Sequence, residues 1–132
     1  MGIKIFTAGN VVPDSLASLN MIKESCLDGQ EIEFVRQVYM DNGTAKQIGD
    51  LAKKLELGLS IHASYFINLC SEDRQKIEDS KKRILLACER AHFLGANNVV
   101  FHAGFYEKKT PEETYLQIRE QIIDLKKHIA GQ

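Results

Sequence analysis

Short apolar runs alternate along this chain with longer segments in which apolar residues recur every three or four positions. The short runs are typical of buried strands, and the longer segments are typical of helices that bury one face. The pattern therefore predicts four strands, each followed by a helix. The predicted strands cover residues 3–6, 31–39, 59–62 and 98–102.

The predicted helices have recognisable starts and stops. Glycine follows each of the first three helical patterns, as expected of a residue that ends helices. The later helices are predicted to start at Thr44, Ser71 and Thr110, and both threonines belong to capping-box patterns. The predicted buried faces comprise Leu16, Leu19 and Ile22, then Ile48, Leu51, Ala52 and Leu55, then Ile77, Ile84, Leu85, Cys88 and Ala91, and finally Tyr115, Ile118, Ile122, Leu125 and Ile129.

Strict alternation of strand and helix predicts a parallel sheet with right-handed crossovers. Four such units in 132 residues correspond to half of an eight-stranded TIM-like (β/α) barrel, which takes about 250 residues. We interpret residues 1–132 as a single α/β domain of this half-barrel type.

Helices on one side of that sheet would leave its other face open. We expect this face to be apolar, lined by Ile5, Phe34, Ile61 and Val100 or by their strand neighbours. An open apolar face with two free edges favours self-association or completion by a second half-barrel.

Two histidines occupy equivalent places in the pattern. His62 ends the run Leu59-Ser-Ile-His, His102 ends the run Val99-Val-Phe-His, and a small residue follows each. In parallel α/β folds the active site forms at the carboxyl ends of the strands, so both imidazoles are predicted to face one pocket. The bland alternative is that each is a hydrogen-bonded packing residue. The remaining histidines, His92 and His128, fall within predicted helices and are interpreted as surface or packing residues.

The net charge of −1 provides no general attraction for a polyanion, so nucleic-acid binding would need a local basic patch or a metal ion. Basic residues that could contact phosphate cluster on the predicted helices and loops, but such clusters are typical of solvated faces. These clusters are Lys81–Arg83, Lys108–Lys109 and Lys126–Lys127.

Three widely spaced cysteines, Cys26, Cys70 and Cys88, form no Cys-x-x-Cys pair. This spacing argues against a disulfide framework and against a thiolate zinc site, and it fits free thiols in a reducing compartment. No apolar run is long enough for a membrane span or a signal peptide. We therefore expect a cytoplasmic protein with no membrane partner.

The residues around the two histidines resemble a known family. The segments His62-Ala-Ser-Tyr-Phe-Ile-Asn-Leu, Phe101-His-Ala-Gly and Glu33-Phe-Val-Arg are similar to the endonuclease IV family of apurinic/apyrimidinic endonucleases. The similarity is closer to the archaeal-type members. It covers essentially the whole chain and corresponds to the N-terminal half of the family's zinc-dependent TIM barrel, ending just before the fifth strand.

The resemblance implies roles for five residues. His62 and His102 match two histidines that bind zinc together with a glutamate from the fifth strand, which has no counterpart in these 132 residues. Tyr65 and Phe66 match loop positions that enter duplex DNA at an abasic site, and Arg36 lies in a neighbouring loop that provides a similar wedge. The implied cofactor is zinc, and the implied partner is abasic-site duplex DNA.

A catalytic zinc has three protein ligands, so two imidazoles alone predict a weak site and little activity. Three functions are open at this point. The first is a zinc-dependent abasic-site hydrolase whose second half is supplied by truncated coding sequence or by another chain, and the second is a sugar isomerase or epimerase of the same barrel superfamily. The third is a non-catalytic half-barrel that homodimerises and brings four histidines to one mouth. The Tyr65-Phe66 loop favours the first, since a sugar isomerase needs no wedge for duplex DNA.

Overall fold

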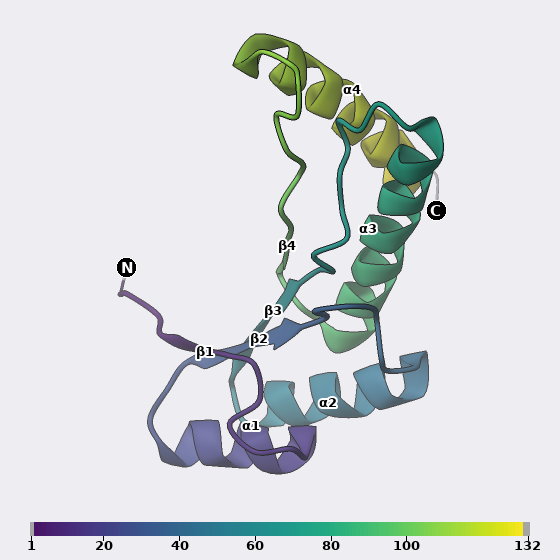
Figure 1. Ribbon diagram of the computed structural model, residues 1–132. Helices are drawn as coiled ribbons and strands as arrows, with labels where there is room; N and C mark the ends of the chain where they lie inside the picture. The colour runs from purple at the N-terminus through teal and green to yellow at the C-terminus, as the bar shows by residue number, and fades with distance from the viewer. Residues whose placement is uncertain (1, 131–132) are drawn as a thin grey trace.

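The four predicted strand-helix units are present in the computed structural model, which describes residues 2–130 (Figure 1). The strands pair in chain order and are all parallel, which confirms the prediction of four parallel βα units. The strands are β1 (Phe6–Ala8), β2 (Gly29–Glu33), β3 (Gly58–His62) and β4 (Asn98–Val100). The helices are α1 (Ser15–Glu24), α2 (Asn42–Lys54), α3 (Arg74–Leu94) and α4 (Pro111–Ala130).

All four strands differ from their predicted bounds: β3 begins one residue earlier, β4 ends at Val100 instead of His102, and β1 and β2 differ most. β1 begins at Phe6, because the N–H of Ile5 donates to the Asp28 carboxylate (2.7 Å) instead of to a strand carbonyl. β2 ends at Glu33 because its neighbour β3 ends at His62. Beyond Glu33 and His62, the segments that follow β2 and β3 are joined only by isolated hydrogen bonds between loops.

Two helix starts move from the predicted hydroxyl residue to a nearby aspartate. Asp41 caps α2, its carboxylate accepting from the N–H of Thr44 (2.7 Å), so the predicted cap at Thr44 is wrong. Asp73 caps α3, and Ser71 instead accepts a bond from the Asp73 N–H (3.2 Å). A carboxylate is a better acceptor than a hydroxyl for the exposed N–H groups of a helix start, and its charge also suits the helix dipole.

The core lies between the sheet and the helices. Alternate strand residues face it, among them Ile32 and Ile61, which are neighbours in the β2–β3 register. The predicted stripe of α3 is confirmed at Ile77, Ile84 and Ala91, which are buried. Within residues 2–130, no helix combines the length and the apolar character needed to cross a membrane.

The opposite face of the sheet is open and largely polar. The register places Glu31 beside Ser60, and it places Glu33, His62 and Val100 in one row. Since paired residues of parallel strands point to the same side, these side chains share a face. The expected apolar face is therefore replaced by a polar one.

The expectation for individual residues of this face is partly wrong. Phe34 and Ile61 are fully buried because they point toward the helices, where the apolar surface is removed from water. Ile5 (59% exposed) and Val100 (44%) are exposed as expected.

Helix α4 lies alongside α3 rather than over the sheet (Figure 1). Its capping box is confirmed, because the Thr110 N–H donates to the Glu113 carboxylate (2.8 Å). Leu125 is buried, but Tyr115 (66% exposed) and Ile129 (46%) are not, so the predicted buried face is wrong at both ends of α4. A helix that packs on a single neighbour buries only the middle of its apolar stripe.

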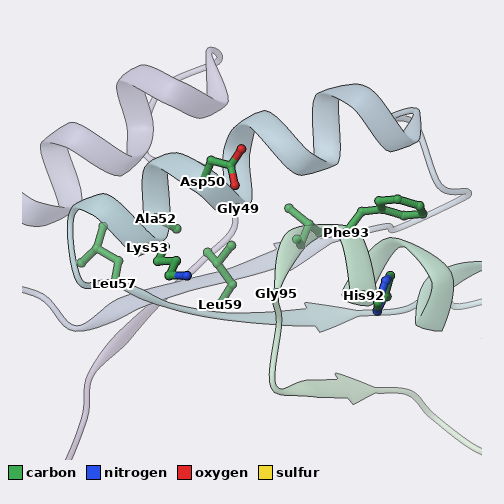
Figure 2. Close-up of a pocket in the computed structure, with 10 residues that line it drawn as sticks. Gly49, Asp50, Ala52, Lys53, Leu57, Leu59, His92, Phe93 and Gly95 are labelled. Carbon is green, nitrogen blue, oxygen red and sulfur yellow. The ribbon is translucent and has the colours of Figure 1, made fainter.

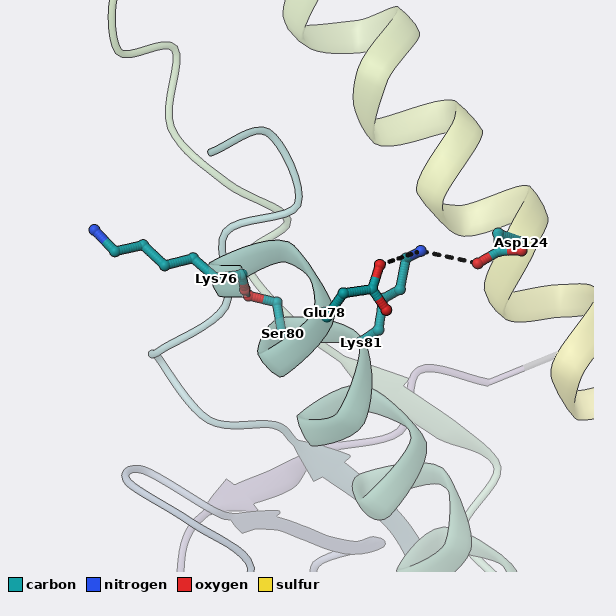
Figure 3. Close-up of polar contacts among 5 residues, drawn as sticks. All are labelled: Lys76, Glu78, Ser80, Lys81 and Asp124. Atoms are coloured by element: carbon teal, nitrogen blue, oxygen red, sulfur yellow. Dashed lines mark hydrogen bonds and ion pairs between the residues drawn. The ribbon is translucent and has the colours of Figure 1, made fainter. Parts of the chain in front are cut away.

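An ion pair ties α4 to α3. The Lys81 ammonium lies 2.8 Å from the Asp124 carboxylate on α4 and 3.3 Å from Glu78 on its own helix (Figure 3). The hydrogen bond from Lys81 lowers the pKa of the Asp124 carboxyl group. The same bond raises the pKa of the Lys81 ammonium group.

Candidate functional site

His62 and His102 lie side by side at the carboxyl ends of β3 and β4. Their ring centroids are 5.2 Å apart and the ring planes are tilted by 46°. The Ala63 N–H donates to the Val100 carbonyl (2.8 Å), and this hydrogen bond continues the pairing of β3 with β4 past the end of β3. His62 is half-buried, whereas His102 is exposed. The structure thus brings both imidazoles to one edge of the sheet.

A backbone contact orients the His62 ring. Its Nδ1 lies 2.9 Å from the carbonyl oxygen of Ala63. A carbonyl can only accept, so Nδ1 carries the proton in this bond and Nε2 of the neutral ring keeps its lone pair. Metal-binding histidines commonly make this contact with the nitrogen that does not bind the metal.

Tyr65 adds a third ring to the pair. Its ring centroid is 5.3 Å from that of His62 and 6.0 Å from that of His102. The Tyr65 N–H donates to the Val35 carbonyl (3.1 Å), so the loop after β2 holds this residue in place. We call His62, Tyr65 and His102 the ring cluster. Tyr65 is 49% exposed and presents its outer face to solvent.

Arg36 and Phe66 belong to two adjoining loops beside the ring cluster. The Ser64 hydroxyl donates to the Arg36 carbonyl (2.9 Å) and accepts from the Phe66 N–H (3.2 Å). Arg36 is exposed and forms no ion pair among residues 2–130, and Phe66 is 61% exposed. Both side chains are accessible to a binding partner.

Glu33 and Tyr39 are members of this edge that the sequence reasoning did not single out. Glu33 is the register partner of His62, and a Cβ at Gly9 would stand 3.4 Å from its carboxylate. Burial and the negative charge of Glu33 raise the pKa of the Tyr39 hydroxyl. The alternation of Glu31 and Glu33 with Ile32 and Phe34 was the available signal, because it separates a polar face from an apolar one.

The loops after β3 and β4 are bound to each other below the ring cluster. Leu69 N–H donates to the Ala103 carbonyl (2.8 Å), and the Cys70 thiol donates to the Phe105 carbonyl (2.7 Å). Gly104 lies at the centre of this contact. A Cβ there would stand 2.7 Å from both the Asn68 amide oxygen and the Cys70 sulfur, so a larger residue would have to displace both side chains.

These residues supply part of a zinc site. Imidazole is a good zinc ligand, and two rings with centroids 5.2 Å apart can approach one ion. No group of three or more histidine, cysteine, aspartate or glutamate side chains suited to a metal occurs in residues 2–130. The described chain therefore offers His62 and His102, and a catalytic zinc needs a third protein ligand from elsewhere.

A cavity of about 300 Å³ lies at the other end of the sheet, between α2, α3 and the start of β3 (Figure 2). Its polar side chains are Asp50, Lys53 and His92. Gly49 allows the close approach of the two helices, since a Cβ there would stand 2.6 Å from the Leu94 carbonyl oxygen. We interpret this cavity as a packing gap, because the chemistry of parallel α/β folds lies at the opposite end.

A parallel βα sheet with polar side chains at its carboxyl edge defines a protein of the α/β-barrel class. The sequence profile of the xylose isomerase-like TIM barrel family matches residues 21–131, and the chain belongs to this family. An uncharacterized protein of Methanocaldococcus jannaschii is 32% identical over 109 residues. That match covers 83% of this chain but only 39% of the relative, so the chain spans about two fifths of that protein's length.

Solved structures of two activities share the fold. D-psicose 3-epimerase of Clostridium cellulolyticum, solved with D-tagatose, superposes with a TM-score of 0.76 at 14% identity, over 95% of this chain and 48% of the epimerase. Endonuclease IV of Thermus thermophilus superposes with a TM-score of 0.66 at 20% identity, over 92% of this chain and 46% of the endonuclease. Each likeness shows the fold, and in each the chain spans about half of the other protein.

Proposed function

We propose that residues 1–132 form one domain that supplies the zinc- and DNA-binding half of an archaeal-type, endonuclease IV-like hydrolase acting at abasic sites. The observation that supports this most is the ring cluster itself. It combines two imidazoles with Tyr65, whose neighbour Phe66 and loop partner Arg36 are exposed. The residues that we assign to zinc and those that we assign to the duplex thus come from one edge of the sheet.

The roles follow from these positions. His62 and His102 would hold one zinc ion, and a bound zinc supplies an activated water and charge stabilisation for phosphodiester hydrolysis. Tyr65 and Phe66 present exposed aromatic faces that can stack on bases, which offsets part of the cost of unstacking at an abasic site. Arg36 can contact a backbone phosphate or fill the gap left in the stack.

The third zinc ligand would come from the half that closes the barrel, whether this half is a continuation of the same chain, a complementary chain or a second copy. Either a complementary half-barrel chain or a second copy could pair with the free edges of β1 and β4. A second copy would add two more histidines at the same mouth, since a two-fold axis repeats the site. Sedimentation analysis with and without zinc distinguishes a dimer from a monomer.

Zinc titration by calorimetry tests the metal site. We expect His62→Ala and His102→Ala each to weaken zinc binding at least tenfold, because loss of one of two imidazoles leaves a single ligand. His92→Ala is the matched control, since His92 is exposed on α3 and lies away from the ring cluster. Zinc binding that persists in both ring-cluster variants would overturn the assignment.

Incision of an abasic-site duplex tests the activity. We expect the chain alone to show little cleavage and the barrel completed by its partner to show cleavage that a chelator abolishes. Tyr65→Ala should then reduce incision while zinc binding is kept. Chelator-resistant cleavage would contradict the proposal.

One observation favours a second function, a sugar isomerase or epimerase. The open face of the sheet places Glu31, Glu33 and Ser60 where they could bind the hydroxyl groups of a sugar. Protection of the Glu33 region from hydrogen exchange by a ketohexose, without protection by abasic DNA, would favour this alternative. The reverse pattern would favour the endonuclease.

A further inference from the structure

A cleft beside the ring cluster has aromatic walls and a positive rim. Its volume is about 500 Å³, and it lies between the loop after β3, the start of α3 and the loop after β4. Phe66 and Phe105 line it from separate loops, and each is 61% exposed. Tyr65 lines the same cleft, so the ring cluster and the cleft share one residue.

The cations of the cleft are available for a ligand. Lys76 and Arg83 both line it, and neither forms an ion pair within residues 2–130. Figure 3 shows Lys76 extending away from the ion pairs of Lys81. The carboxylate of the cleft, Asp79, is already engaged by the side-chain amide of Gln75 (3.0 Å) and by Lys82 (3.8 Å). The free charge of the cleft is therefore positive.

The cleft is also held rigidly. The Asn68 N–H donates to the Ser80 hydroxyl (2.9 Å), and the Asn68 side-chain amide donates to the Glu107 carboxylate (2.8 Å). These bonds connect α3 with both loops. The loops that carry Phe66 and Phe105 are consequently tethered before a ligand arrives, which lowers the entropy lost on binding.

We propose that this cleft binds one nucleotide of single-stranded DNA, with its base between Phe66 and Phe105 and its phosphates on Lys76 and Arg83. Exposed aromatic faces with nearby unpaired cations are the combination that single-stranded nucleic acid recognises, since every base has a face for stacking and every nucleotide has a phosphate. The inference rests on the proposed DNA function. It adds a site for an unpaired nucleotide outside the zinc centre.

Fluorescence anisotropy with labelled oligothymidylate in excess EDTA tests the site without metal. We expect Phe105→Ala to weaken binding roughly tenfold through the loss of base stacking. Tyr115→Ala is the matched control, because Tyr115 is similarly exposed (66% against 61% for Phe105) but lies on α4 outside the cleft. The affinity of this variant for oligothymidylate should stay unchanged. Equal affinities of the two variants would overturn the proposal.

Salt dependence tests the phosphate contacts. Replacing both Lys76 and Arg83 by alanine should make the negative slope of log K against log salt less steep by about 1.4, since each phosphate contact to a single strand contributes about −0.7. The control is Lys4→Ala combined with Lys54→Ala, which removes the same charge from two exposed lysines elsewhere and should leave the slope unchanged. Equal slopes in the two double variants would overturn the phosphate assignment.

The outcome also separates this inference from the proposed function. Binding of oligothymidylate in EDTA together with a failure of the completed barrel to cut abasic DNA would support the cleft and reject the nuclease. Zinc-dependent cutting that is unaffected by Phe105→Ala, with no oligothymidylate binding, would do the opposite.

Discussion

The two faces of the sheet come from the same strands, yet they have opposite chemistry. In β3, Ile61 is fully buried against the helices, while its neighbours Ser60 and His62 point to the open side. The covered face holds the apolar residues that stabilise the fold. The open face holds Glu31, Glu33 and His62, whose groups can bind or react. Stability and chemistry are thus separated at single-residue spacing.

The largest expected effect tests the covered face. Ile61→Ala should lower the free energy of unfolding by about 2–5 kcal/mol, because it leaves a cavity in the core. Val100→Ala, on the open face and 44% exposed, should lower it by about 1 kcal/mol or less, because its side chain is only partly removed from water. Urea unfolding of both variants measures the difference. Similar losses would show that the open face contributes to stability as much as the core does.

A smaller effect is expected where the open face is packed. Phe6 lies against Gly58 at the base of this face, and a Cβ at Gly58 would stand 2.5 Å from the end of its ring. Gly58→Ala should therefore cost about 1–3 kcal/mol from overpacking.

Gly43 provides the control substitution for Gly58→Ala. Gly43→Ala meets only an ordinary contact, with Asp41 at 3.5 Å, and should be neutral or slightly stabilising. Combining Gly58→Ala with Phe6→Ala should recover part of the loss, because the two residues share one space. A purely additive double variant would place the strain elsewhere.

The smallest effect concerns charges that lie on neither face. Hydrogen bonds from Thr44, Thr110 and Lys81 lower the pKa of the Asp41, Glu113 and Asp124 carboxyl groups. A lowered pKa in the folded state means that these groups stabilise the protein above their ordinary values of 3.8, 4.5 and 3.8, and that this stabilisation is lost as the pH falls below them.

Urea unfolding followed from neutral to strongly acidic pH measures this loss. Asp41→Asn keeps the capping oxygen but removes the charge, so it should flatten the acid limb slightly. If Glu33→Gln flattened the profile more, the open face would contribute to acid stability and the contrast between the two faces would fail.

Much of the fold followed from local patterns, because each element has its own period. The histidine pair was also visible, since both residues end apolar runs of the same kind. The side of the sheet to which Phe34 and Ile61 point was predicted wrongly, because a strand pattern separates two faces without indicating which one the helices cover. The cap at Asp41 was missed because Thr44 offered a second plausible start.

The cleft and the wider site could not be read from local patterns. Phe105 reaches the cleft because its loop is bound to a loop 35 residues earlier through the Cys70 thiol. Glu33 meets His62 only through the register of β2 with β3. Such proximity arises from tertiary contacts between distant residues, which no short window of sequence encodes.

The contact at Gly104 has a consequence for how this protein tolerates change. The loop of His62 and the loop of His102 touch at Gly104, where the Asn68 amide and the Cys70 sulfur occupy the space that a side chain at position 104 would need. In a library randomised at positions 68, 70 and 104, functional clones should keep glycine at 104 unless the residues at 68 and 70 have both become smaller. The close approach of the two histidine loops would then be detectable as covariation among positions that take no part in the chemistry.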